Sequence, residues 1–206
     1  LKELIDYSCQ LYNNQSINFD RKSIHTNLSV FIIDRLKNYM KEKDIRQDII
    51  ESSLIDFDLN NIFVIFTKAD RLNKVIKKQV GIDLIENYKR AFNILNSETQ
   101  QQNEDYIGSA DPALFKSNFE KDLFKKIHDI RKNFTSINLE NDYDSQLSLL
   151  ASLKKEVESF FDNVIVNDND VVIKKNRLEL LKMLCNTFDK YFNFEKIEFL
   201  NEKTSI

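Results

Sequence analysis

The chain has 206 residues, a formal net charge of −3, and only two glycines and one proline. Because loops and β-bends normally rely on Gly and Pro, this scarcity, with many Leu, Ile, Lys and Glu, predicts an all-α protein. The acidic balance excludes a generic basic nucleic-acid coat but allows a local basic face. No apolar stretch approaches the ~20 residues of a membrane span. Cys9 and Cys185 lack metal-type spacing. We therefore expect a cytoplasmic protein with reduced cysteines and no membrane partner.

The first third of the chain repeats apolar residues at helical spacing. A helix is predicted up to residues 41–43, a short helix follows over 45–54, and Asp58 is expected to cap a third helix that reaches Val75. The predicted apolar faces are Leu28, Phe31, Ile32, Leu36, Tyr39 and Met40, then Ile45, Ile49, Ile50 and Leu54, then Ile62, Phe63, Phe66, Ala69 and Val75. We assign residues 1–58 to a helical segment that leads into a bundle formed by residues 59–206.

The middle of the chain contains one clear helix-start signal. Gly81 predicts a break, after which a helix runs to Leu95, and the polar residues 97–110 predict a surface loop. Asp111 and Pro112 then favour a helix start, because Asp caps and Pro fits the first turn. The helix that follows is expected to bury Phe115, Phe119, Leu123, Ile127, Ile130 and Phe134.

The last third reads as two helices joined by an acidic turn. Apolar spacing from Leu147 to Phe161 predicts the first helix. The β-branched residues 164–166 are poor at continuing it, so the chain is expected to run extended there. Asp170 is then expected to cap the final helix, whose apolar face is Leu178, Leu181, Leu184, Cys185, Phe188 and Phe192.

No catalytic or metal-binding pattern is present. The two histidines, His25 and His128, have no neighbours that would make a ligand set or a nucleophile pair, and no Gly-rich phosphate loop occurs. We therefore expect no catalytic residue, no metal site and no cofactor in this chain.

Charge is unevenly distributed along the sequence. Residues 68–90 contain seven basic and three acidic residues, whereas residues 139–170 contain eight acidic and two basic ones. Such segregation suits a face that binds phosphates, and it equally suits ion pairs between helices. On the residues alone, ion pairs between helices are the favoured interpretation.

Three stretches, in this order, resemble the β subunit of bacterial-type glycyl-tRNA synthetase, and together they span nearly the whole chain. They are FIIDRLKNYMKEKDIRQDIIESSL (Phe31–Leu54), YKRAFNIL (Tyr88–Leu95) and FFDNVIVNDNDVVIKKNRLELLKML (Phe160–Leu184). The third is similar to the family's C-terminal signature, in which Phe-Phe-Asp-x-Val-x-Val leads to Asn-Arg-Leu-x-Leu-Leu. The family's upstream domains, including an HD-type fold, have no counterpart here, so the chain is expected to be the C-terminal part alone.

The resemblance implies a helical bundle similar to the anticodon-binding domain of arginyl-tRNA synthetase. In that family the α subunit uses ATP to form glycyl-adenylate, and the β subunit binds the tRNA within an α2β2 assembly. The implied partners are tRNA-Gly and the α subunit, and this chain alone is expected to be non-catalytic. The alternative is a helical scaffold that docks the α subunit or other β-subunit domains.

The final segment supplies four candidate RNA-binding residues. Lys174 and Lys175 lie in a predicted exposed first turn and are candidates for phosphate contacts. Arg177 has two possible roles: it bonds carbonyls of residues 164–166 or pairs with Asp162, or it reaches a phosphate. Asn163 is either a turn residue or a reader of a base edge.

Four further candidates come from the basic stretch. Lys89 and Arg90 follow Tyr88 and either contact RNA or form salt bridges to Glu86 or a neighbouring helix. Arg71 and Lys74 share a helix face and would extend the same basic strip. If residues 68–90 and 174–177 converge on one concave face, RNA binding is favoured, whereas dispersal into internal pairs favours the scaffold.

Overall fold

The protein is built from helices, and the computed structural model describes residues 2–12, 15, 17–55, 61–102, 105–136 and 142–198. Within these ranges there is no β-strand, and the all-α prediction is confirmed. The α-helices are α1 (Lys2–Tyr12), α2 (Arg21–Glu42), α3 (Gln47–Ser53), α4 (Ile62–Val75), α5 (Gln79–Gln102), α6 (Asn118–Ser136), α7 (Tyr143–Ala151), α8 (Lys154–Asn163) and α9 (Val171–Phe188). Two 3-10 helices are η2 (Pro112–Leu114) and η4 (Phe194–Lys196).

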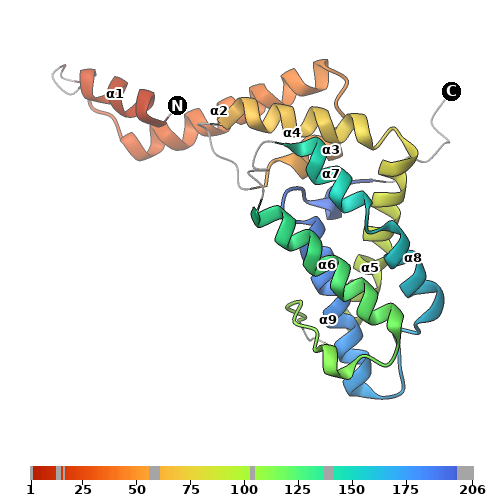
Figure 1. Ribbon diagram of the computed structural model, residues 1–206. Helices are drawn as coiled ribbons and strands as arrows, with labels where there is room; N and C mark the ends of the chain where they lie inside the picture. Colours follow the sequence, from red (N-terminus) through yellow and green to blue (C-terminus); the bar gives the residue numbers. More distant parts are fainter. Residues whose placement is uncertain are drawn as a thin grey trace.

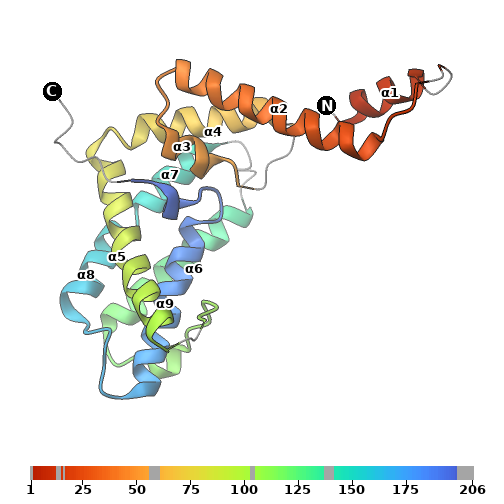
Figure 2. The same ribbon diagram turned by 180° about the vertical axis from the view of Figure 1, so that it is seen from behind.

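The helices form an upright bundle and a crosswise arm (Figure 1). In the bundle, α5 and α6 both pack against α9, and α8 packs against α5 and α6. In the arm, α2 and α4 lie across the top of the bundle, and α1 and the first half of α2 project away from it as a hairpin (Figure 2). The lower end of the bundle in Figure 1 is far from this hairpin, and we call it the distal end.

A cluster of aromatic rings fills the core where the arm meets the bundle. Tyr88, Phe188, Phe192 and Phe194 are at most 1% exposed, and neighbouring rings lie 5.2–6.0 Å apart between centroids. The Tyr88 hydroxyl donates to Asp189 at 2.9 Å. Rings packed at these separations and angles stabilise a core beyond the burial of their area. Tyr88 is therefore a core residue.

Helix α5 is longer than the sequence predicted. The expected surface loop at 97–110 is wrong in its first part, because α5 continues to Gln102. Its last turns contain no Gly or Pro, and Gln100 and Gln101 donate to the side chains of Asn96 and Ser97 four residues earlier. The extension places Glu98 beside α9, where it is 5% exposed. Gly81 also lies inside α5, since the break falls at residues 76–78.

The Asp111–Pro112 signal starts a shorter element than predicted. Asp111 caps η2 by accepting from Ala113 N–H at 2.9 Å, and α6 begins only at Asn118. Phe115 is buried just before α6, but Phe119 is 37% exposed, so its predicted burial is wrong. The rest of the predicted apolar face is buried as expected, at Leu123, Ile127, Ile130 and Phe134.

The segment after α9 returns to the arm. Asn193 N–H donates to Ser52 O at 3.0 Å, and Glu198 N–H donates to Asp48 Oδ2 at 2.8 Å, so η4 and its neighbours pack on α3. These contacts fasten the arm to the end of the bundle helix α9. The predicted division at residues 58 and 59 lies outside the described residues, and it stays a prediction.

Within the described ranges, no helix combines the length and apolar character that crossing a bilayer requires. The same part of the chain contains no group of three or more His, Cys, Asp or Glu side chains arranged to hold a metal ion.

Candidate nucleic-acid interface

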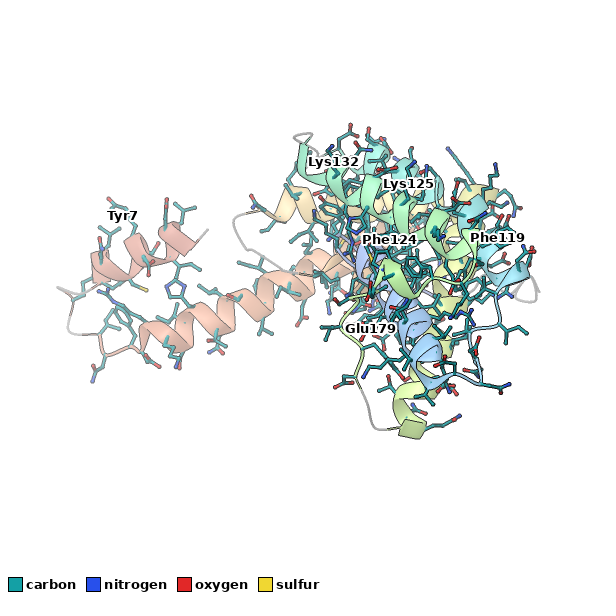
Figure 3. All side chains as sticks on the ribbon, turned by 60° about the horizontal axis from the view of Figure 1, so that its bottom comes forward. Tyr7, Phe119, Phe124, Lys125, Lys132 and Glu179 are labelled. Atoms are coloured by element: carbon teal, nitrogen blue, oxygen red, sulfur yellow. The ribbon has the colours of Figure 1, made fainter. Side chains whose placement is uncertain are left out.

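Two connections and two helix starts meet at the distal end. The loop from residue 105 to η2 leads into α6, and the turn at residues 164–170 leads into α9. Figure 3 looks toward this end, with Phe119 and Phe124 on α6 and Glu179 on α9. Both helix starts are capped within the chain: Asp170 accepts from Val172 N–H and Ile173 N–H, and Glu120 accepts from Lys116 N–H and Ser117 N–H.

Arg177 holds the turn before α9. Its Nη1 donates to Ile165 O at 2.8 Å and to Asp168 Oδ2 at 2.6 Å. The guanidinium is buried, and the residue as a whole is 7% exposed. The prediction that Arg177 bonds a carbonyl of residues 164–166 is therefore confirmed. Its carboxylate partners among the described residues are Asp168 and Glu120 rather than Asp162.

Glu120 extends this network into α6. Its Oε1 accepts from Arg177 Nε at 2.8 Å, and its Oε2 accepts from the N–H groups of Lys116 and Ser117 at 2.9 and 2.7 Å. Ser117 Oγ in turn accepts from Glu120 N–H at 3.3 Å, which completes a capping box at the start of α6. Burial alone would raise the pKa of Glu120, but the hydrogen bonds from Arg177 and Ser117 outweigh it and hold that pKa below its ordinary value.

A second network fixes the loop at residues 105–111 against α9. Glu179 Oε2 accepts from the N–H groups of Ile107, Gly108 and Ser109 at 3.1, 2.7 and 3.0 Å. Gly108 has a φ of 81°, a conformation that favours glycine. Three converging N–H groups satisfy the buried carboxylate, so the loop has one defined shape.

Asn176 fixes the end of the same loop. Its Oδ1 accepts from Asp111 N–H at 2.7 Å, and its Nδ2 donates to Asp111 O at 3.0 Å. Both halves of the side-chain amide are thereby used on one residue of the loop. Two consecutive residues of α9 thus hold the two connections: Asn176 bonds the loop at Asp111, and Arg177 bonds the turn at Ile165.

A groove of about 550 Å³ lies between this loop and the start of α9. Apolar side chains stand exposed along it: Ile107 and Val171 are each 75% exposed, and Val172 is 58% exposed. Lys175 and Ser109 also line the groove. An apolar shelf beside a fixed backbone and a lysine offers contacts for an unstacked base and its phosphate.

The other long groove, between α6 and α8, is mixed in charge. Lys125 lies on its wall (Figure 3), together with Lys126, Lys155, Asp122, Asp129 and Glu156. Opposite charges side by side give no continuous positive track for phosphates. The distal groove is also mixed in charge, because Asp105, Asp111 and Glu179 line it together with Lys175. It is the better candidate for its exposed apolar side chains, and not for its charge.

Three of the predicted residues besides Arg177 lie at the distal end. Lys175 is exposed there. Lys174 differs from its predicted exposed position, because its Nζ pairs with Glu98 at 2.6 Å and its side chain is 21% exposed. The longer α5 is the cause, since it carries Glu98 alongside the first turn of α9. Asn163 is exposed, and its Nδ2 donates to Ser159 O at 2.9 Å, a contact within α8.

The other four predicted residues do not join that group. Arg71 pairs with Asp144 at 3.3 Å, and Lys74 pairs with Asp70 at 2.6 Å. Lys89 Nζ donates to Glu195 O at 2.6 Å, and the Arg90 guanidinium lies 4.3 Å from the centre of the Phe161 ring. These contacts spread over α4 and α5 instead of converging on one concave face. The predicted basic strip is thus divided among internal partners.

Sequence reasoning missed Glu120, Asn176 and Glu179. Glu120 could have been found, because Ser117 and Glu120 have the spacing of a capping box. Asn176 and Glu179 bond backbone groups 65 to 72 residues away, and no local pattern announces such contacts.

Comparison with known proteins defines the class of this helical bundle. A family model described as the DALR anticodon binding domain matches residues 84–202. The chain belongs to this family. The matched region includes most of α5 and all of α6 to α9, so the distal end lies inside it.

Sequence similarity to known proteins extends over nearly the whole chain. It is 37% identical over 198 residues to the glycine–tRNA ligase beta subunit of Rickettsia bellii (strain OSU 85-389), covering 96% of this chain and 27% of that protein. It is also 37% identical over 191 residues to the glycine–tRNA ligase beta subunit of Rickettsia prowazekii (strain Madrid E), covering 93% and 26%. The chain thus spans about a quarter of the length of the curated relatives it matches. The resemblance inferred from the three sequence stretches is confirmed.

Proposed function

We propose that this chain is the tRNA-binding domain of a cytoplasmic glycine–tRNA ligase β subunit, and that it holds the anticodon stem-loop of tRNA-Gly. In this proposal the partner α subunit uses ATP to activate glycine within an α2β2 assembly, and this domain positions the tRNA. It needs no cofactor of its own. The observation that carries the proposal is that the part of the chain matching the anticodon-binding family includes the distal groove and its two fixed connections.

The distal groove suits a single-stranded loop better than a duplex. RNA-binding proteins commonly recognise unstacked loop bases by stacking, apolar contact and hydrogen bonds to base edges. Ile107, Val171 and Val172 supply apolar contact, and Lys175 on the wall of the groove supplies a positive charge for a neighbouring phosphate. Because Glu179 and Arg177 fix the loop and the turn, little order is lost on binding.

A binding titration tests the proposal. The chain is titrated with tRNA-Gly, with a non-cognate tRNA and with the anticodon stem-loop of tRNA-Gly, each at two salt concentrations. We expect tRNA-Gly to bind more tightly than the non-cognate tRNA, the stem-loop to keep most of the affinity, and affinity to fall as salt rises. Affinity that does not change with salt would contradict phosphate contacts.

A helical scaffold that docks the α subunit or other β-subunit domains is the second candidate. It is favoured by the internal partners of Arg71, Lys74, Lys89, Arg90 and Lys174. If the chain binds none of the RNAs but binds the purified α subunit, the scaffold function is supported and the tRNA-binding function is contradicted.

A further inference from the structure

The hairpin of α1 and the first half of α2 exposes more apolar surface than any other part of the described chain. Ile5 and Cys9 of α1 are buried against α2, and Asp6 meets His25 Nε2 at 2.7 Å. A second apolar row stays outside, and Tyr7 stands on the hairpin well away from the bundle (Figure 3). Four exposed large apolar residues line the groove between the two helices, Leu4, Tyr12, Ile17 and Leu28, and three more, Tyr7, Leu11 and Phe31, are exposed elsewhere on the hairpin.

The exposed apolar area of the hairpin lies at the upper end of what a free surface shows. Leu4 is 65% exposed, Tyr7 60% and Leu11 58%. With ~150–200 Å² for a fully exposed large side chain, the seven residues present roughly 550–750 Å² over the whole hairpin, of which the four in the groove present roughly 300–400 Å². A soluble monomer seldom leaves a contiguous apolar patch of more than ~300–600 Å², and larger ones usually mark interaction sites. Interfaces between domains of one chain begin at ~600 Å².

The shape of this surface fits a third helix. The groove between α1 and α2 has a volume of about 470 Å³. Its walls are apolar apart from Ser8, and its lining includes Ile5, Cys9, Phe19 and Ile24. Two packed helices leave a groove that an amphipathic helix fills with apolar residues at i, i+3, i+4 and i+7. Since Asp6 is already held by His25, the occupant needs an apolar stripe at this position and no charged partner.

We infer that this hairpin docks an amphipathic helix from another domain of the same glycine–tRNA ligase β-subunit polypeptide. The inference rests on the proposed function for the identity of that polypeptide. In the Rickettsia relatives the matching segment is only 26–27% of the protein. The counterpart of this hairpin is therefore covalently joined to far more protein than it contains. A covalently linked domain acts at an effective concentration on the order of millimolar, which favours it over a second copy.

Hydrogen–deuterium exchange of two proteins tests the inference. One is this 206-residue chain, and the other is the full-length Rickettsia bellii β subunit. Protection factors correct for the sequence differences, and the segments of α5 and α9 serve as an internal reference. We expect α1 and the first half of α2 to be at least about tenfold better protected in the full-length subunit, while α5 and α9 are protected alike in both.

Two results would overturn the inference. Hairpin protection that is equal in the two proteins would mean that no other domain covers this face. If light scattering shows this chain forming dimers, and hairpin protection rises with its concentration, then the occupant is a second copy.

Matched variants locate the contact. Glu at the Rickettsia bellii positions aligned with Leu4 and Leu11 should return the hairpin to fast exchange. Glu at the position aligned with Phe63 should not, because Phe63 is 79% exposed on α4, outside the hairpin. If the Leu pair leaves protection unchanged, the docking surface lies elsewhere.

The tRNA titration keeps this inference separate from the proposed function. In this chain, Leu4→Glu with Leu11→Glu should change the affinity for tRNA-Gly by less than about twofold, because the hairpin is far from the distal end. A chain that binds no tRNA, with a protected hairpin in the full-length subunit, would sink the proposed function and leave the docking surface standing. Tight tRNA binding with an unprotected hairpin would do the reverse.

Discussion

The distal end and the hairpin differ in how their side chains are satisfied. At the distal end, buried charged groups meet one another and the backbone within the chain, as Arg177 does with Glu120 and Ile165. The hairpin leaves Leu4, Tyr7 and Leu11 exposed on an apolar row. In this molecule, buried charged side chains hold the backbone of loops and turns in place. The exposed apolar side chains of the hairpin indicate a surface for contact with another part of the protein.

The largest expected effect tests whether the distal end is internally satisfied. Arg177→Ala leaves the fully buried Glu120 carboxylate without its charged partner, and breaking a buried pair typically costs about 3–5 kcal/mol. We expect a matching loss in the free energy of unfolding by urea, and weaker tRNA binding through disorder of the turn. Arg177→Ala combined with Glu120→Gln should recover part of the loss, since no charge is then stranded. An Arg177→Ala protein that unfolds like the wild type but binds tRNA weakly would make Arg177 an RNA ligand.

Removing the carboxylate of Glu179 should have the next largest effect. Glu179→Ala leaves the N–H groups of Ile107, Gly108 and Ser109 without their acceptor, which should cost about 2–3 kcal/mol. Amide exchange at these three residues should accelerate, and tRNA affinity should fall. Glu158→Ala is the matched control, because Glu158 is exposed on α8, and it should change neither the amide exchange nor the tRNA affinity. Faster loop exchange with unchanged tRNA affinity would move the binding surface away from this loop.

Two carboxylates, the fully buried Glu120 and the half-buried Asp189, have pKa shifts of opposite direction. Glu120 has a charged partner and a lowered pKa, whereas burial raises the pKa of Asp189 to about 6, although Tyr88 O–H and Phe194 N–H donate to it. Because the folded pKa of Asp189 lies above its unfolded value, its contribution to stability is complete below about pH 4 and is lost as pH rises through about 6.

Asp189→Asn should abolish the loss of stability between pH 4 and pH 7, because Asn does not ionise. The variant and the wild type should unfold at similar urea concentrations near pH 4. By pH 7 the variant should be more stable by about 1–2 kcal/mol, which is below the full value of the shift because the group keeps some solvent access. A difference between the two proteins that stays constant with pH would show that Asp189 does not titrate in this range.

The smallest effects separate two neighbouring lysines at the distal end. Lys174→Ala removes the ion pair with the buried Glu98 and should cost about 1 kcal/mol, whereas Lys175→Ala should stay within about 0.5 kcal/mol. In tRNA titrations, Lys175→Ala should weaken all sequences alike and lower the salt slope by about one unit. If Lys174→Ala changes the slope and Lys175→Ala does not, the phosphate lies on the α5 side of α9.

Local sequence patterns predicted part of this structure but did not predict the contacts between residues far apart in the sequence. The β-branched residues 164–166, followed by Asp170, were enough to predict an extended turn, a capped helix and a role for Arg177 in holding it. The ion pair between Arg177 and Glu120 joins residues 57 apart, and nothing in the spacing of either residue announces the other. Seven basic residues between 68 and 90 indicated a strip, but their partners depend on helix packing.

Helix lengths and the family were predictable to different degrees. The polar run after Leu95 contains no breaker, so composition alone could not end α5, and Glu98 became buried against α9. The three family stretches identified the fold but predicted none of these contacts. Sequence similarity to a family predicts the arrangement of the helices, whereas the partner of a given lysine depends on the particular residues around it.

The return of the chain onto α3 has a consequence for how the protein folds during synthesis. Glu198 N–H meets Asp48 Oδ2 across 150 residues of sequence. At ~5–20 residues per second, a ribosome needs about 8–30 s to cover that distance. During that interval the segment that packs on α3 has not been synthesised, so Ile49 and Ile50, which are fully buried in the folded protein, lack part of their covering. The arm is therefore a region in which a chaperone would meet apolar side chains on the nascent chain.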